Sequence, residues 1–186
     1  MAQAARTSEV QPTPYAVASD FCRIFAEEMS SLYQLSFLLT ADPAKAEQCF
    51  VSGLEDSAGA NRVFREWARS WARRAIIQNA IRMIQPVPRS GAFPVIGDEL
   101  ASNGPLAALL GLKTFERFVF VMSVLEGYSD QDCKTLLRCS ARDIVRARAQ
   151  AVLQIAQSAK TTAPVKEAAQ ASGGVFAGAQ LLTQTA

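Results

Sequence analysis

Hydrophobic residues recur at three- and four-residue intervals along much of this chain, and that spacing predicts amphipathic α-helices. The first such run covers residues 20–40, where the apolar side chains share one helical face: Phe21, Ile24, Phe25, Met29, Leu32, Leu35 and Leu39. Asp42 and Pro43 follow, a pair typical of a helix start, because aspartate caps free backbone N–H groups and proline fits the first turn. We therefore expect one helix over 20–40 and a second, shorter one after it.

Residues 61–84 predict a third helix with two different faces. The first face is aromatic and alanine-rich, and at about 100° per residue its members lie within an arc of about 100°: Phe64, Trp67, Ala68, Trp71 and Ala75. The second is a stripe of arginines within an arc of about 80°: Arg62, Arg65, Arg69 and Arg73. We interpret the aromatic arc as buried, so Trp67 and Trp71 are expected in the core and not as base-stacking platforms. The arginine stripe is a solvated face, a nucleic-acid contact or a contact with an acidic protein.

Three stretches of low complexity divide the chain. Residues 85–105 contain four prolines and three glycines and predict a linker between two helical units, 20–84 and 106–160. Residues 1–19 and 161–186 mix small and polar residues without a period, so we expect a disordered N-terminal tail and a flexible C-terminal tail.

The second unit contains a hydrophobic helix followed by two capped ones. Residues 114–125 are apolar on most sides, which predicts a helix at the centre of its small domain. Ser129 with Asp132, and Ser140 with Asp143, each place a hydroxyl three residues before an acid, a pattern like the capping box that starts helices. Two short helices joined by a tight turn form a helix-turn-helix. The predicted fold is therefore all-α, with two small helical domains joined by a Pro/Gly-rich linker and a helix-turn-helix in the C-terminal one.

The last helix also has two faces. The apolar side is expected to hold Ile144, Val145, Ala147, Ala151, Val152 and Ile155. The other side holds Arg142, Arg146 and Gln150 within about 80°. Arginine contacts guanine or a phosphate, and glutamine contacts adenine, so this face is a candidate for the DNA major groove. The alternative is that this face is simply exposed to solvent.

Three other basic residues lie on that helix or just before it. Lys134 and Arg138, on the preceding helix and in the turn, are candidates for contacts with the DNA backbone. Arg148 lies on the apolar side, so it must reach solvent or pair with an acid.

Composition narrows the chemistry further. The chain of 186 residues has no histidine, which excludes Ser-His-Asp and Cys-His catalysis and H-E-x-x-H metal sites. Four cysteines without a C-x-x-C pair predict free, mostly buried thiols, no zinc site and a reducing cytoplasm.

No secretory leader is recognised, and no apolar run approaches the roughly 20 residues of a membrane span. We predict a cytoplasmic protein without membrane insertion, cofactor, metal or enzymatic activity. The net charge of +2 does not by itself indicate a nucleic-acid partner.

Two parts of the sequence resemble one protein family. Residues 112–129, LKTFERFVFVMSVLEGYS, with 136–140, LLRCS, resemble the fourth conserved region of extracytoplasmic-function RNA polymerase sigma factors. In that family an E-R-x-V-F-V-L-x-x-L-E-G-Y-S stretch leads into a helix-turn-helix that contacts the −35 promoter element. Residues 32–47, LYQLSFLLTADPAKAE, resemble the start of the second region. FREW at 64–67 and AIIQNAIR at 75–82 resemble its later helix.

The resemblance implies a function as well as a fold. It implies a sigma-factor-like transcription initiation protein that binds promoter duplex DNA through the C-terminal helix-turn-helix and RNA polymerase core through the N-terminal bundle. An inhibitory anti-sigma protein is a further implied partner. The second region of the family also opens the −10 element, so the arginines of the N-terminal unit become candidates for contact with the polymerase or with that element: Arg62, Arg65, Arg69, Arg73 and Arg74.

Several positions depart from the family pattern. Val51 and Ser52 stand where the family carries an amide and an acid on its polymerase-binding surface. Arg74 and Gln78 stand where Asn and Asp are usual, and Val145 replaces a lysine of the recognition helix. These departures support an alternative, a diverged sigma-like adaptor or regulator that has lost polymerase engagement and acts through protein–protein interaction.

Overall fold

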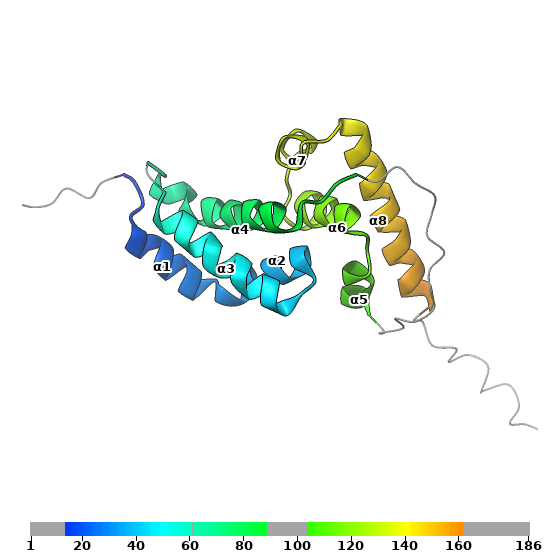
Figure 1. Ribbon diagram of the computed structural model, residues 1–186, viewed down its shortest axis with the longest axis horizontal. Helices are drawn as coiled ribbons and strands as arrows, with labels where there is room; N and C mark the ends of the chain where they lie inside the picture. Colours follow the sequence, from blue (N-terminus) through cyan, green and yellow to red (C-terminus); the bar gives the residue numbers. More distant parts are fainter. Residues whose placement is uncertain (1–13, 61, 89–103, 162–186) are drawn as a thin grey trace, which may run out of the picture.

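The protein is all-α, as the sequence predicts. Its structure, a computed structural model, describes residues 14–60, 62–88 and 104–161, with side chains described as far as residue 158 (Figure 1). Helices dominate these residues, and the only strand-like pairing among them is an isolated antiparallel bridge between Tyr15 and Phe64.

Four helices form the N-terminal bundle: α1 (Ala18–Glu27), α2 (Met29–Thr40), α3 (Pro43–Ala58) and α4 (Ala68–Ile84). Helix α3 packs against both α2 and α4, and α1 lies across α3 and α4 (Figure 1). At Gly53 of α3 the backbone approaches α4 so closely that an added Cβ would lie 2.5 Å from Cδ1 of Ile76. A side chain at this position would therefore force the Ile76 side chain to shift, whereas the backbone of α4 at Ile76 Cα is 3.5 Å away and leaves room for a Cβ.

The start of α3 follows the predicted chemistry. The backbone N–H of Lys45 donates to Oδ1 of the Asp42 carboxylate at 3.0 Å, and Pro43 is the first helical residue. The single helix predicted over 20–40 is wrong, because the chain breaks at Glu28, whose φ of −106° and ψ of 19° are not helical. The Glu28 carboxylate is paired with Arg69 of α4, and Met29 beyond the break is 57% exposed. The break therefore turns Met29 away from the core.

The helix predicted from residue 61 starts only at Ala68, after a short 3₁₀ turn, η1 (Arg65–Trp67). Trp67 is 60% exposed and Trp71 is 41% exposed, so their predicted place in the core is wrong. The buried face of α4 is instead a row of small and aliphatic side chains: Ala68, Ala72, Ala75, Ile76 and Ala80. Alanines let α4 approach α2 and α3 closely, and the indoles lie beside that row.

The N-terminal tail predicted over residues 1–19 is too long. The Ala16 amide donates to the Val63 carbonyl at 2.7 Å, and the Arg65 amide donates to the Pro14 carbonyl at 3.0 Å. Ala16 is buried, so residues 14–19 belong to the bundle. Residues 1–13 of the predicted tail lie outside the described residues.

The C-terminal half contains α5 (Pro105–Leu110), α6 (Thr114–Phe120), the π-helical turn η2 (Val121–Leu125), α7 (Asp130–Leu137) and α8 (Ala141–Thr161). Helix α6 packs against α8 and also against α2 of the N-terminal bundle. Phe118, Val119 and Met122 are fully buried. The predicted central position is therefore confirmed as far as Met122, whereas it is wrong for the end of the segment, where Val124 and Leu125 are 47% and 49% exposed.

Most of the predicted linker, residues 89–103, and most of the predicted C-terminal tail, 162–186, lie outside the described residues. Pro105, the last residue of the predicted linker, begins α5. Helix α8 extends to Thr161 and so takes up the first residue of the predicted tail. Within the described part of the chain, no helix combines the length and the apolar character needed to span a bilayer.

The cysteines occupy different environments. Cys49 and Cys133 are fully buried, as predicted, and burial raises the pKa of each thiol to about 11. Cys139 is partly buried, whereas Cys22 is exposed, so the prediction of a buried thiol is wrong at Cys22. On α1, Phe21, Ile24 and Phe25 are buried, whereas Cys22 falls outside that buried face.

Candidate functional site

Helices α7 and α8 are joined by a three-residue turn, Arg138 to Ser140. Arg138 ends α7 in the left-handed region with φ of 50°. Ser140 and Asp143 then exchange hydrogen bonds: the Asp143 amide donates to Ser140 Oγ, and the Ser140 amide donates to Asp143 Oδ2, each at 3.2 Å. The Ser140 hydroxyl also donates to the Asp143 carboxylate, and this bond holds the pKa of Asp143 below its ordinary value. The predicted capping box at the start of α8 is confirmed.

The orientation of α7 against α8 is fixed by a second set of contacts. Ser129 caps α7 by accepting a hydrogen bond from the Asp132 amide at 3.1 Å, as predicted. Arg148, the residue that needed solvent or an acid, pairs with Asp130 at the first turn of α7. This partly exposed ion pair joins the two helices, and the buried residues Ile144, Ala147 and Ala151 set the rotation of α8 about its axis.

The buried face of α8 is narrower than predicted. Ile144, Ala147 and Ala151 are buried where α5, α6 and α7 pack. Val145 is 58% exposed and Val152 is 48% exposed, so their predicted place on the buried face is wrong. The buried strip is only one or two residues wide at each turn of the helix, and both valines lie outside it.

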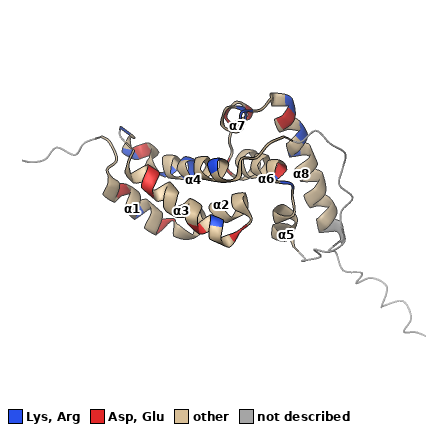
Figure 2. Cartoon of the chain, viewed as in Figure 1, with Lys and Arg blue, Asp and Glu red and all other residues tan. Residues whose placement is uncertain are grey.

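The DNA-contact candidates lie on α7, on the turn after it and on α8. Arg138, Arg142 and Arg146 are exposed, while Lys134 and Gln150 are partly buried. Figure 2 shows that the charged residues of α8 gather in its first half and that the following turns carry none up to the end of the described side chains. Arg146 also donates to Asp143 Oδ1 at 3.2 Å. Because such an exposed pair contributes less than about 1 kcal/mol, Arg146 can readily exchange Asp143 for another anion.

The arginines of the N-terminal bundle lie in a different environment. Arg65 donates to the Asp20 carboxylate at 3.2 Å. Arg69 donates to Glu27 Oε2 at 2.7 Å and also pairs with Glu28. These contacts join α4 and the turn before it to α1 and the break after it, so both arginines are used within the fold.

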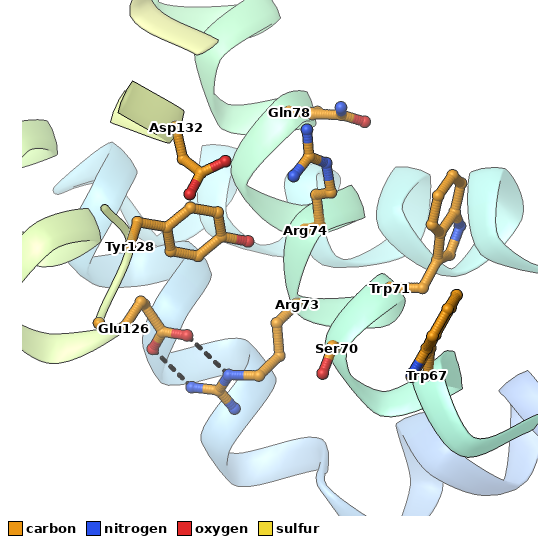
Figure 3. A pocket seen from close by; sticks show the side chains of 10 residues that line it. Trp67, Ser70, Trp71, Arg73, Arg74, Gln78, Glu126, Tyr128 and Asp132 are labelled. Atoms are coloured by element: carbon orange, nitrogen blue, oxygen red, sulfur yellow. Dashed lines mark hydrogen bonds and ion pairs between the residues drawn. The ribbon is translucent and has the colours of Figure 1, made fainter. Parts of the chain in front are cut away.

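Arg73 makes the strongest of these contacts. Its Nε and one terminal nitrogen donate to the two carboxylate oxygens of Glu126 at 2.7 and 2.6 Å (Figure 3). The other terminal nitrogen donates to Ser31 Oγ at 2.9 Å. The Glu126 side chain is only 9% exposed. The hydrogen bonds to Glu126 raise the pKa of Arg73. Because Glu126 follows η2, this bidentate pair joins the N-terminal bundle to the C-terminal half.

A second arginine also joins the two halves, but from the C-terminal half to the N-terminal bundle. Arg117 of α6 is 6% exposed and donates to the Leu39 carbonyl, at the C-terminal end of α2, at 3.4 Å. It also donates to the carbonyls of Leu110 and Leu112 at 3.2 and 3.3 Å. Burial lowers the pKa of Arg117. The partial negative charge at the end of α2 favours the guanidinium there.

A groove of about 720 Å³ lies beside the Arg73–Glu126 pair, between α4 and the start of α7. Figure 3 shows the side chains that line it, which include two of the family departures, Arg74 and Gln78, together with Trp67, Ser70, Trp71, Arg73, Glu126, Gly127, Tyr128 and Asp132. Arg62 is exposed in the turn before α4, with φ of 65°. The five arginines therefore do not form one open stripe. Whether they contact polymerase or the −10 element stays a prediction.

Sequence periodicity did not identify the acidic partners of these arginines. Glu126 lies 53 residues from Arg73 along the chain, and Asp20 lies 45 residues from Arg65. No local spacing relates such pairs. Among the described residues, no group of three or more His, Cys, Asp or Glu is arranged to hold a metal ion.

Comparison with solved structures gives a weak structural likeness. No protein-family model and no curated protein matches the chain. A solved structure of the sigma factor RpoE, in complex with the anti-sigma factor NepR from Bartonella quintana, is similar over 76% of this chain and 98% of that one, with 17% identity and a TM-score of 0.46. A likeness at this level carries no argument about function, which is inferred below from the residues of this chain.

Proposed function

We propose that this protein is a sigma-factor-like transcription protein that binds promoter duplex DNA through α7 and α8 and meets RNA polymerase core through its N-terminal bundle. One observation carries the DNA-binding part: Arg142 and Arg146 are exposed on the first turns of α8, which is capped at its start and packed on its opposite face. Helices with this arrangement place their N-terminal residues in the major groove. Such a role belongs in the cytoplasm.

The proposed roles of the basic residues follow from where they lie. Arg142 and Arg146 are suited to base edges or phosphates in the groove, and Gln150 is one turn further along. Arg138 in the turn and Lys134 on α7 flank this face and are suited to the phosphate backbone. Binding through such contacts releases counterions and is therefore sensitive to salt.

In the polymerase part of the proposal, the contacts with polymerase are made by Arg62 and Arg74, the two candidate arginines that take no part in the intramolecular pairs described above. Arg62 is exposed at the end of the bundle, and Arg74 faces the groove. Arg65, Arg69 and Arg73 would contact polymerase or promoter only after giving up their internal carboxylates. An inhibitory anti-sigma protein, which the family resemblance implies, stays a predicted partner.

Salt dependence tests the DNA-binding part. The affinity of the full chain for labelled random-sequence duplex DNA is measured by fluorescence anisotropy between 50 and 300 mM salt. Four phosphate contacts predict a slope of log affinity against log salt of about −3 to −4, at about −0.9 for each contact. Affinity that is independent of salt would exclude this mode of binding.

A second function, the sigma-like adaptor or regulator, is favoured by a separate observation. Arg65, Arg69 and Arg73 are already engaged within the chain, and the groove beside them exposes two indoles, Trp67 and Trp71. Exposed tryptophans and arginines are enriched at protein interfaces. On this reading the bundle binds a protein other than polymerase.

Capture of purified core polymerase separates the two functions. The tagged full chain is mixed with core polymerase and the eluate is analysed by size-exclusion chromatography. A stable, stoichiometric complex supports the sigma-like function and contradicts the adaptor. No complex, together with salt-dependent DNA binding, supports a DNA-binding regulator without polymerase engagement.

A further inference from the structure

The first turns of α8 carry two parallel rows of exposed side chains, and only one row is charged. Arg142 and Arg146 form the charged row. Val145 and Ala149 form the other, which we call the apolar row; both are exposed, and Val145 is 58% exposed. On a helical wheel these four positions lie within an arc of about 100°. They therefore face the same partner.

The opposite side of α8 holds this face outward. Ile144 and Ala147 are buried under the helix, and Arg148 is paired with Asp130 of α7. The cap formed by Ser140 fixes the first turn. A rotation that buried Val145 would break these contacts, so Val145 remains at the surface.

Stability of α8 does not explain a valine at position 145. A β-branched residue favours a helix less than alanine, lysine or arginine does, because its χ1 rotamers are restricted. Val145 also adds little to the core, since most of its side chain is exposed. Val145 therefore offers the surface an apolar group that is free to contact a partner.

The DNA major groove presents one apolar group, the C5 methyl of thymine. Four residues of helix rise about 6 Å, which spans about two base pairs at 3.4 Å each. An arginine row beside an apolar row therefore matches a guanine beside a thymine. We propose that Val145 and Ala149 read thymine methyl groups next to the base pairs contacted by Arg142 and Arg146. This specificity rests on the proposed DNA-binding function.

Deoxyuridine, which is thymidine without its methyl group, tests this assignment. Sites for the full chain are selected from a random duplex library, and each thymine of the selected site is then replaced in turn by deoxyuridine. Burial of one methyl group contributes about 0.8 kcal/mol, which corresponds to about four-fold in affinity. We expect a loss of about that size at one or two thymines next to a guanine, and none elsewhere.

Two matched variants assign the effect to the apolar row. Val145→Ala should abolish the deoxyuridine penalty at one of these thymines. Val152→Ala, a change at a second exposed valine two turns further along α8, should leave the penalty in place. Equal affinity for thymine and deoxyuridine at every position, or an unchanged penalty in Val145→Ala, overturns the assignment while DNA binding stands. A selection that recovers no duplex site overturns both the assignment and the proposed function.

Discussion

Arginine serves two different purposes in the two halves of this protein. In the N-terminal bundle, Arg69 and Arg73 donate to carboxylates from other elements, and Arg73 does so with both oxygens of the partly buried Glu126. On α8, Arg142 and Arg146 are exposed, and the nearest acid is the capping residue Asp143. A regular stripe of arginines on a helix therefore does not by itself predict a binding surface. The acids that other elements bring to the stripe decide its role.

The largest expected effect on folding tests the N-terminal side of this comparison. Arg73→Ala leaves the Glu126 carboxylate, 9% exposed, without its bidentate partner. Hydrogen bonds to charged groups contribute about 1.5–3 kcal/mol, so we expect a loss of about 2–3 kcal/mol in the free energy of unfolding, measured with urea. Arg74→Ala on the same helix should change it by less than about 0.5 kcal/mol. Equal losses would show that the Arg73–Glu126 pair does not hold the halves together.

The next effect tests the capped start of α8. Ser140→Ala removes the oxygen that accepts the Asp143 amide hydrogen bond. Loss of an N-cap costs about 1 kcal/mol, so unfolding should be easier by that amount. Amide hydrogen exchange should rise most in the first turn of α8, and elsewhere only by the amount that the easier global unfolding accounts for. An increase in the first turn of α8 no larger than that in α4 would contradict a local role for the cap.

Arg69→Ala should have a smaller effect than Arg73→Ala, although both side chains pair with glutamates. The Arg69 side chain is 54% exposed, and exposed ion pairs contribute less than about 1 kcal/mol. We therefore expect a loss of stability clearly smaller than that of Arg73→Ala at low salt, which disappears in urea titrations at about 1 M salt. A loss as large as that of Arg73→Ala would mean that exposure does not separate the two pairs.

The smallest effect is a pH dependence at the α8 cap. The hydrogen bond from Ser140 lowers the pKa of Asp143 in the folded protein. Its contribution is therefore present above the unfolded value, about 3.9, and is lost as pH falls through the lower folded value. Asp143→Asn should be less stable than the wild type at pH 7, and urea midpoints should converge below about pH 4. A constant difference across this range would contradict the assignment.

Local sequence signals predicted the parts of the fold that depend on neighbouring residues. The caps at Asp42, Ser129 and Ser140 are each made by atoms three residues apart, and all three are present. The all-α class and the central position of the segment from residue 114 as far as Met122 follow from periodicity, which reports burial on one helical face. Such features need no knowledge of distant contacts.

Features that depend on tertiary contacts could not be predicted in the same way. The helix over 20–40 breaks at Glu28, which pairs with Arg69, and α4 begins seven residues later than its pattern indicates. The later start leaves Trp67 outside the helix. Trp71 lies within α4, and its exposure depends on which face of α4 packs against α2 and α3. The sequence predicts that Arg148 reaches solvent or pairs with an acid, but only the packing of α7 on α8 identifies Asp130 as its partner.

A charge-matched comparison of duplex DNA binding tests the central contrast most directly. Arg142→Ala with Arg146→Ala and Arg65→Ala with Arg69→Ala each remove two positive charges, from α8 and from the bundle respectively. The first pair should weaken binding at least ten-fold, at about 1–3 kcal/mol for each base contact, and flatten the salt slope by about 2 if both arginines contact phosphates. The second pair should leave the affinity within about two-fold of the wild type. Equal losses from the two pairs would contradict the account, because binding would then follow total charge and not the exposed face of α8.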